Sequence, residues 1–559
     1  MKLRLFLRQL WDKCFTGSSI LSIVLMVIML VIVLSPMLVR GFKAIFFYGT
    51  NEFREMQLAV FDRGDSEKIR AETAEVEQNR RFVYEALDRF RRGIDTDHLT
   101  SRVRKMYRDY GDYLRDNGIT GDRYSELRAR AKTLRNALCD AFESQDKQNI
   151  QQHLQTVLDS RGDPDFEGTI IAQYVPLARQ YAHIVQTVDL SQRDQYAQIL
   201  DEVQEALRKL FGPSLDEPTP ALTMDQYGAT RWDVAQRELQ RLIWIEKWIE
   251  TEPGQPLEKK LTRRKDFFAD TELEPIFDRI ENNLADLLRP RFTFYWQYFI
   301  DGSTDGHYFG GVGPEIIGTL LLTLFAMLFA IPLGIISAAY LVECAGDNII
   351  VRLIRTCINT LAGVPSIVFG LFGMAFFVLF LFPRLGRFGH ETLGIFSAAT
   401  AENLSKPNII AASLTLGLLV LPVIIRASEE AIRAVPRTYK EASLALGAGR
   451  FRTFVTVIMP AAAPGILTGI ILSLSRAAGE TAPILFTGAI AFGPIPRSIL
   501  EPTRALSYGS YDIAVGDRLA MLVPHKQYGM VMTLIMLVLC LNIIAIWIRS
   551  RASRKLRGV

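Results

Sequence analysis

Six long stretches without a charged side chain constrain the fold of this 559-residue chain more than any other feature. Each stretch is long enough to cross the hydrocarbon core of a bilayer, about 30 Å thick, as a helix. A helix can do so because it satisfies its backbone hydrogen bonds internally. We therefore predict an all-α, polytopic membrane protein with six transmembrane helices. The uncharged stretches are 17–39, 316–342, 356–383, 407–425, 453–475 and 527–548.

The third stretch is longer than one crossing requires. Its length suggests that an interfacial segment, 348–360, precedes the helix that crosses the membrane. The second stretch contains Pro332 and Gly334, which membrane helices tolerate and which often mark kinks or close packing.

Charged residues are concentrated before residue 310, although they make up only 22% of the chain against 49% for hydrophobic residues. The net charge of +4 is small for this length and gives no reason to expect a nucleic-acid partner. The five cysteines show no metal-binding spacing. The polar region 41–310 contains only Cys139, so it cannot hold an internal disulfide.

Basic residues indicate which ends of the helices lie in the cytoplasm. Four of them fall within the first 13 positions, before an apolar core longer than that of a signal peptide. We therefore predict that 1–40 is a cytoplasmic N-terminus followed by a retained first helix. Six crossings then place the basic tail 549–559 in the cytoplasm and 41–310 outside it, as a large insertion between the first two transmembrane helices.

The insertion 41–310 has enough residues for one or two packed domains. Apolar residues at helical spacing predict helices within 75–92, 123–142 and 231–250. The proline-rich segment 212–223 is predicted to connect two helical groups. A role in binding a partner remains open. Three histidines of this region are scattered without ligand spacing and indicate no catalytic or metal site: His98, His153 and His183.

A polar loop lies between the fourth and fifth stretches. Thr438 and Glu441 have the spacing of a capping box, which favours a short helix starting there. Gly447 and Gly449 follow, and they suit a left-handed helix exit or a tight turn. Taken alone, this pattern fits a surface helix–turn–helix between two membrane helices.

The same loop resembles the cytoplasmic signature of ABC importer permeases, which reads E-A-A, three residues, G, nine residues, I-x-L-P. Three positions depart from the strict form, each to a residue of similar size. The resemblance implies that the loop 426–460 contains a coupling helix that docks in a groove of a cytoplasmic ATPase. The matching residues are Glu441, Ala442, Ser443, Gly447, Val457, Met459 and Pro460.

Four further strings resemble the permease subunits of phosphate-specific ABC importers. The resemblance covers roughly 311–548 and implies a transmembrane domain that imports inorganic phosphate across the bacterial inner (plasma) membrane. Ordinary members of that family have a short loop where this chain has its long insertion. The strings are 318–320 (GTL), 331–335 (IPLGI), 364–371 (VPSIVFGL) and 476–483 (RAAGETAP).

The resemblance also implies the partners of the chain. They are a homologous second permease subunit, a cytoplasmic ATPase dimer, a periplasmic phosphate-binding protein and the lipid bilayer. The sequence has no G-x-x-x-x-G-K-[ST] phosphate loop. We therefore expect ATP to be used by the partner subunit, and this chain to be no enzyme and to bind no cofactor or metal.

Arg476 and Glu480 are charged residues between two apolar runs. An arginine at the centre of a membrane helix costs roughly 2.5–3.5 kcal/mol, so it usually faces a pore or a partner. A spacing of four residues would place both side chains on one helix face. Because a guanidinium can hold an oxyanion by two parallel hydrogen bonds, we predict that this pair lines the substrate pathway.

Arg426, at the inner end of the fourth stretch, is a further candidate for the pathway. Simpler structural roles are open for all three residues. Arg476 and Glu480 could form an ion pair that only holds helices together, and Arg426 could anchor its helix at the interface.

Two other functions fit part of the sequence. The chain could be an ABC importer permease for another oxyanion, such as molybdate or sulfate, sharing only the coupling loop. It could instead be a membrane-anchored sensor or scaffold that acts through its outer region. Recovery of an ATPase with the chain would argue against the second alternative.

Overall fold

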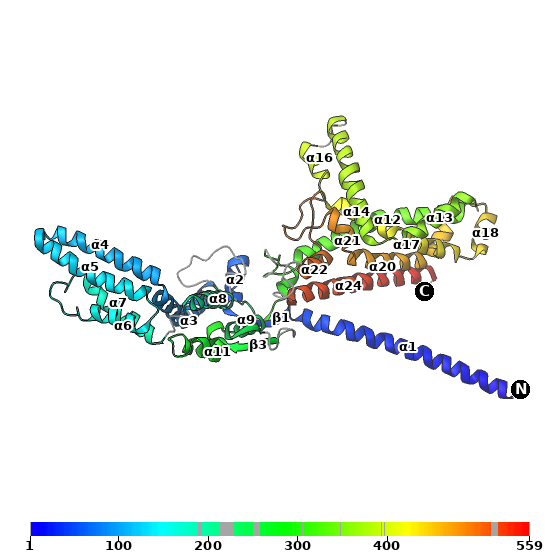
Figure 1. Cartoon of the computed structure of the whole chain (residues 1–559). Coiled ribbons are helices and arrows are strands. Elements are labelled where there is room, and N and C mark those ends of the chain that lie inside the picture. Colours follow the sequence, from blue (N-terminus) through cyan, green and yellow to red (C-terminus); the bar gives the residue numbers. More distant parts are fainter. Residues whose placement is uncertain are drawn as a thin grey trace. The chain divides into compact units, whose positions relative to one another are not determined.

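The described residues of the computed structural model form two compact units. The membrane unit consists of Met1–Phe46 and Phe294–Val559, and the inserted unit consists of Phe47–Thr293. Both are built mainly of helices (Figure 1). The structure describes residues 2–187, 193–212, 229–249, 258–304, 307, 309–346, 348–392, 394–395, 397–515 and 524–557.

The membrane unit confirms the six predicted crossings. Among the described residues, six helices are long and apolar enough to span a bilayer. Helix α13 (Ile349–Leu361) ends before Pro365 and is separate from the third crossing, as predicted for 348–360. The candidate crossings are Phe15–Phe42, Gly313–Cys344, Ser366–Thr392, Ala398–Arg433, Arg450–Gly479 and His525–Arg554.

Long helices and short π-helical turns make up the membrane unit. In chain order they are α1 (Lys2–Phe42), α12 (Gly313–Ala339), η6 (Tyr340–Cys344), α13, α14 (Ser366–Gly373), η7 (Met374–Leu381), α15 (Phe382–Arg387), η8 (Phe388–Thr392), α16 (Ala398–Leu404), α17 (Ile409–Arg433), α18 (Arg437–Ala445), α19 (Arg450–Thr453), η9 (Phe454–Ile458), α20 (Met459–Gly479), α21 (Ala482–Thr487), α22 (Leu506–Val515) and α24 (Pro524–Arg557). Helix α17 packs against both α12 and α20 and belongs to the most buried of the six crossings.

Two membrane crossings contain a π-helical turn just before a proline. Pro460 is the second residue of α20, which directly follows η9, and Pro383 is the second residue of α15, which directly follows η7. A proline lacks the backbone N–H and its ring crowds the carbonyl four residues earlier. A π-helical turn before the proline makes room for the ring, so these turns have a local cause in the sequence.

The inserted unit is also mainly helical, as predicted. Its described elements are β1 (Phe46–Gly49), α2 (Asn51–Phe61), α3 (Ser66–Ile94), α4 (Thr96–Asp116), α5 (Gly121–Glu143), α6 (Lys147–Leu158), the 3₁₀ helix η1 (Ile170–Gln173), α7 (Tyr174–Thr187), α8 (Arg193–Phe211), α9 (Trp232–Ile243), β2 (Trp244–Ile249), β3 (Glu258–Arg263), α10 (Arg264–Phe267), α11 (Glu274–Leu288) and β4 (Arg291–Phe294). Strand β1 pairs with β4, and β2 pairs with β3. Helices α3 and α5 contain the predicted segments 75–92 and 123–142.

The helix predicted over 231–250 is wrong in its second half. Helix α9 ends at Ile243, and Trp244–Ile249 is strand β2, antiparallel to β3. Aromatic and β-branched residues dominate β2, and such residues favour strands when a partner strand is available. The guanidinium of Arg263 also lies over the Trp244 ring, 5.2 Å from its centre. Apart from Gly212, the predicted proline-rich connection 212–223 lies outside the described residues.

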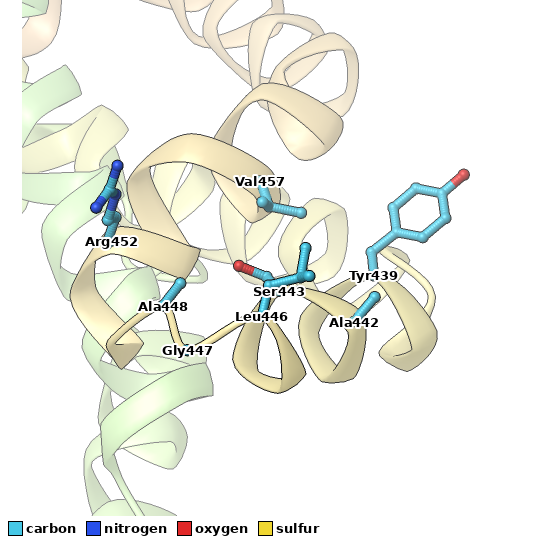
Figure 2. Close-up of a pocket in the computed structure, with 8 residues that line it drawn as sticks. All are labelled: Tyr439, Ala442, Ser443, Leu446, Gly447, Ala448, Arg452 and Val457. Carbon is cyan, nitrogen blue, oxygen red and sulfur yellow. The ribbon is translucent and has the colours of Figure 1, made fainter.

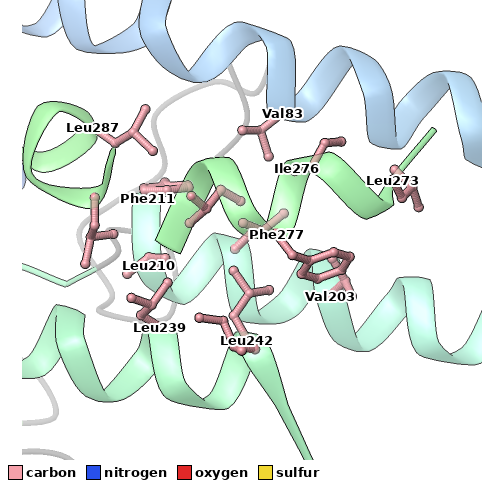
Figure 3. Packing of buried hydrophobic residues seen from close by; sticks show 14 of the residues in the cluster. Val83, Val203, Leu210, Phe211, Leu239, Leu242, Leu273, Ile276, Phe277 and Leu287 are labelled. Carbon is pink, nitrogen blue, oxygen red and sulfur yellow. The ribbon is translucent and has the colours of Figure 1, made fainter. Parts of the chain in front are cut away.

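Two hydrophobic cores hold the inserted unit together. One lies among α3, α8, α9 and α11, where Val83, Leu210, Leu242 and Phe277 interdigitate (Figure 3). The other joins α4, α5, α6 and α7 around Tyr110, a fully buried residue. With these two cores, the helices have their apolar faces buried within the unit itself.

Candidate functional site

The loop contains the predicted short helix, α18, but this helix starts differently from the prediction. Its N-cap residue is Pro436, and no side chain caps its first turn. The capping box predicted from Thr438 and Glu441 is therefore wrong. The fixed φ of proline is already suited to the start of a helix, so α18 begins at Arg437 and Thr438 falls inside it.

The end of α18 confirms the prediction for Gly447, which has a left-handed φ of +83°. The N–H of Gly447 donates to the carbonyl of Leu444, and the N–H of Ala448 donates to the carbonyl of Ser443. These two bonds form a Schellman motif, in which the left-handed residue is usually glycine. Gly449 instead has an extended backbone and precedes α19. The φ angle therefore requires glycine at position 447 but not at position 449.

The loop exposes large apolar side chains that were not predicted from the sequence as part of a site. Leu446 is 90% exposed and Phe451 is 81% exposed, on either side of the Gly447 turn. Leu446 lines a hollow of about 560 Å³. Figure 2 shows Tyr439 and Arg452 at its two ends, with Ser443 and Val457 between them. Apolar residues flanking a glycine turn in a polar loop were the signal that could have identified this surface.

Two contacts tie α18 to neighbouring membrane helices. Lys440 forms an ion pair with Glu343 in η6. The hydroxyls of Ser443 and Thr453 are 3.0 Å apart and link α18 to α19. A displacement of α18 would therefore be passed directly to the ends of two membrane crossings.

The signature residues lie on different sides of α18 or beyond it. Ala442 and Gly447 line the hollow of Figure 2. Glu441 lines a second hollow of about 730 Å³, bordered by η6 and the end of α17. Pro460 is inside the fifth crossing, at the start of α20. The structure thus brings three of these four residues together around α18 and places Pro460 apart from them.

Arg476 and Glu480 form the predicted ion pair, with 3.3 Å between Nε and Oε1. Their side chains are 40% and 20% exposed in the isolated chain. Glu480 does not lie on the same helix as Arg476, because α20 ends at Gly479 and Glu480 has an extended backbone. The prediction of a shared helix face is therefore wrong, although the two side chains meet.

The two strings 364–371 and 476–483, which are far apart in the sequence, meet in the structure. Gly370 in α14 packs so closely against α21 that a Cβ atom there would lie 2.6 Å from the carbonyl oxygen of Ala482. The hydroxyl of Ser507 donates to the carbonyl of Glu480 at 3.3 Å. The chain that follows Arg476 is therefore held between α14 and α22.

Arg426 belongs to a different place in the membrane unit. It is exposed on α17 and lines a hollow of about 250 Å³ with Arg355 and Asn359 of α13. Its neighbour Ala427 packs against Gly469 of α20, which is seven residues, or about 10 Å of helix, from Arg476. The structure therefore does not bring Arg426 together with the Arg476–Glu480 pair.

Another ion pair of the membrane unit is buried, that of Arg504 and Glu315. Arg504 Nη1 lies 3.3 Å from Glu315 Oε1 at the start of α12, and the two side chains are 8% and 1% exposed. Nearby, Lys526 Nζ donates to the carbonyls of Gly310 and Gly311 at 2.6 and 2.8 Å. These contacts join three segments of the chain, and none of the three hollows described above is lined by Glu315, Arg504 or Lys526. We interpret them as structural.

Comparison with known proteins identifies the family. Residues 330–558 match the family described as "Binding-protein-dependent transport system inner membrane component". The chain is 32% identical over 262 residues to the "Probable ABC transporter permease protein YqgI" of Bacillus subtilis, a match that covers 44% of this chain and 80% of the relative. It is 34% identical over 264 residues to the "Phosphate transport system permease protein PstA 1" of Mycobacterium tuberculosis, covering 47% of this chain and 77% of the relative.

These matches agree with the six crossings and with the α18 signature, and they confirm the resemblance to ABC importer permeases. A permease component crosses the inner membrane several times and works in a transporter whose ATPase is a separate subunit. The chain belongs to the family of binding-protein-dependent transport system inner membrane components.

Proposed function

We propose that this chain is a permease subunit of an ATP-driven importer of inorganic phosphate. The observation that carries the proposal is the Arg476–Glu480 pair, whose arginine remains 40% exposed at the end of a membrane crossing. Relatives named as phosphate transport permeases support the choice of phosphate. The proposed partners are a homologous second permease, a cytoplasmic ATPase dimer and a periplasmic phosphate-binding protein.

In this function Arg476 provides the anion contact. Its guanidinium offers paired N–H donors that match two oxygens of phosphate. Glu480 accepts from Nε and leaves the terminal nitrogens of Arg476 for the anion. Because Glu480 follows the helix end, a change in the backbone after Gly479 can separate the pair without unwinding α20. Such a change would alter the affinity for phosphate as the pathway opens to one side or the other.

The α18 loop provides the coupling to ATP hydrolysis. Leu446 and Phe451 form an exposed apolar surface beside the Gly447 turn, and we propose that the ATPase covers it. The Lys440–Glu343 pair then passes the movement of the ATPase to the second crossing. The chain itself supplies no nucleotide chemistry in this scheme and binds no cofactor or metal.

Uptake specificity tests the proposal. Membrane vesicles that contain the complete transporter should accumulate radiolabelled phosphate when ATP is supplied. A hundredfold excess of unlabelled sulfate or molybdate should leave phosphate uptake unchanged, whereas unlabelled phosphate should abolish it. Uptake of sulfate or molybdate with no uptake of phosphate would instead support the alternative of another oxyanion.

The sidedness of the inserted unit gives one prediction. We expect a single cysteine at exposed Gln152 to react with a membrane-impermeant maleimide in intact spheroplasts. The native Cys139 is buried and would be a poor reporter, so it is replaced along with the other cysteines. The matched control is Arg551→Cys, an exposed position in the basic tail predicted to be cytoplasmic, which should react only after lysis. Labelling with the opposite pattern would contradict the proposed topology.

The Gly447 turn gives a second prediction. Gly447→Val should abolish phosphate uptake and ATPase recovery while the chain still inserts in the membrane. A left-handed backbone costs an L-residue roughly 1–2 kcal/mol, and a β-branched side chain suffers most. The matched control is Gly449→Val, because both glycines have open space for a Cβ atom but Gly449 has an ordinary φ. Equal uptake by the two variants would refute the role of this turn.

A further inference from the structure

Exposed aromatic side chains lie around the C-terminal end of α1, the first membrane helix. Phe42 closes α1, and Phe46, Phe294 and Trp296 follow in the adjoining segments of the membrane unit. These four residues, which we call the aromatic rim, are between 44% and 56% exposed. The rings of Phe46 and Phe294 stack with 5.0 Å between their centres, and Phe42 lies 6.4 Å from Phe46. Three of the four rings are therefore neighbours in space, and Trp296 follows Phe294 two residues along the chain.

The opposite side of the same segments is packed inside the protein. Ala44, Ile45, Tyr295 and Tyr298 are all buried. The N–H of Tyr295 donates to the carbonyl of Ile45 at 2.8 Å, which fixes the two segments side by side. The chain here thus presents one side to the protein and one aromatic side to its surroundings. Several large apolar side chains exposed together are unfavourable in water and usually mark a contact surface.

The position of the rim follows from contacts between α1 and α24. Gly41 packs against Tyr528 and Met532 of α24, and Ala44 packs against Gly529. Arg40 also donates to the hydroxyl of Tyr528 at 2.8 Å. Residues 528–532 form the first turns of the crossing that begins at His525. The rim therefore lies at the level where two of the membrane crossings meet the bilayer surface.

The chemistry at this level suits lipid better than water or a polar partner. Tryptophan prefers the headgroup region of a bilayer, and phenylalanine side chains insert at the boundary between headgroups and acyl chains. Arg40 and Lys43 are exposed beside the rim, and cations at such positions reach the phosphates of lipid headgroups. We propose that the aromatic rim lies in the headgroup layer and binds phospholipid directly.

Lipid bound to the aromatic rim would hold α1 in place, which the packing of the membrane crossings does only in part. The most apolar part of α1 has no residue buried against the rest of the chain, and α1 is held mainly by α24. An apolar helix with few protein contacts can rotate and tilt in the bilayer. The aromatic rim, bound to lipid at the end of α1, restrains both motions. The inference does not depend on which solute is transported.

Photocrosslinking of the full-length chain in phospholipid nanodiscs tests the inference. Benzoylphenylalanine replaces Phe294 in one protein and Trp296 in another, so that an aromatic side chain is kept at each position. After illumination, we expect phospholipid adducts at both positions, seen as a mass increase of the labelled peptide. The control is benzoylphenylalanine at Tyr113 of the inserted unit, which is exposed to a similar extent, 42%. Lipid adducts at the rim should exceed those at position 113 at least tenfold.

A second measurement keeps the inference testable if either photoreactive protein inserts poorly. The chain has six tryptophans, and five of them are changed to phenylalanine so that only Trp296 remains. Lipids brominated near the headgroup should quench its fluorescence at least twofold, while aqueous acrylamide should quench it weakly. A tryptophan at position 113, in a background without the others, should show the reverse. Crosslinks from the rim to protein, equal lipid adducts at all three positions, or strong acrylamide quenching of Trp296 would each overturn the proposal.

Discussion

Arg476→Lys is expected to assemble normally and to transport phosphate at least about tenfold more slowly than the unchanged protein. Lysine keeps the positive charge but loses the planar pair of donors that binds two oxygens of an anion. Arg476→Ala should transport still less, because it removes the charge as well. The measurement is the initial rate of phosphate uptake divided by the amount of complex inserted in the membrane.

A role for Arg476 only as the partner of Glu480 leads to the opposite results. In that case lysine at position 476 would restore most of the uptake, because it can still pair with the carboxylate. The double variant Arg476→Met with Glu480→Gln would also be tolerated, since neither charge would be left alone in the membrane. Near-normal uptake by the double variant would defeat the assignment of this pair to the substrate pathway.

The membrane crossings could be predicted because a single physical requirement determines them. About twenty apolar residues are needed to span hydrocarbon, and few other structures use such a run. The left-handed Gly447 was also predictable, since glycine at a helix end has a specific backbone use. The start of α18 was not, because Pro436 and Thr438 can each begin a helix and only the structure shows which does.

Contacts between distant segments could not be predicted from the sequence. Glu315 and Arg504 are 189 positions apart, and neither lies in a pattern that indicates the other. The same holds for Gly370 and Ala482, which bring two of the family strings together. For Arg476 and Glu480 the spacing correctly predicted a pair, but it could not show that the helix stops between them. Strand β2 was not predicted, because it forms only by pairing with β3, which lies further along the chain.

Two arginine–glutamate pairs of the membrane unit, Arg476–Glu480 and Arg504–Glu315, should respond differently to the same substitution. Arg504→Met leaves Glu315, which is 1% exposed, as a buried charge without its partner. Breaking a buried pair in this way typically costs about 3–5 kcal/mol. We therefore expect several-fold less inserted complex and a lower unfolding temperature in detergent. Arg476→Met, by contrast, should yield a normal amount of complex that transports poorly, because its pair is partly exposed.

The double variant Arg504→Met with Glu315→Gln separates the loss of the pair from the loss of packing. Removing both charges should restore most of the inserted complex, because no buried charge is left unpaired. It should also restore uptake, since Arg504 and Glu315 form a pair separate from Arg476 and Glu480. A double variant that assembles normally but fails to transport would show that Arg504 and Glu315 act in the transport cycle, and it would overturn their assignment as structural. Replacing each arginine by methionine therefore distinguishes the two roles. Loss of inserted complex identifies an arginine that stabilises the fold, and loss of uptake by a normally inserted complex identifies one that takes part in transport.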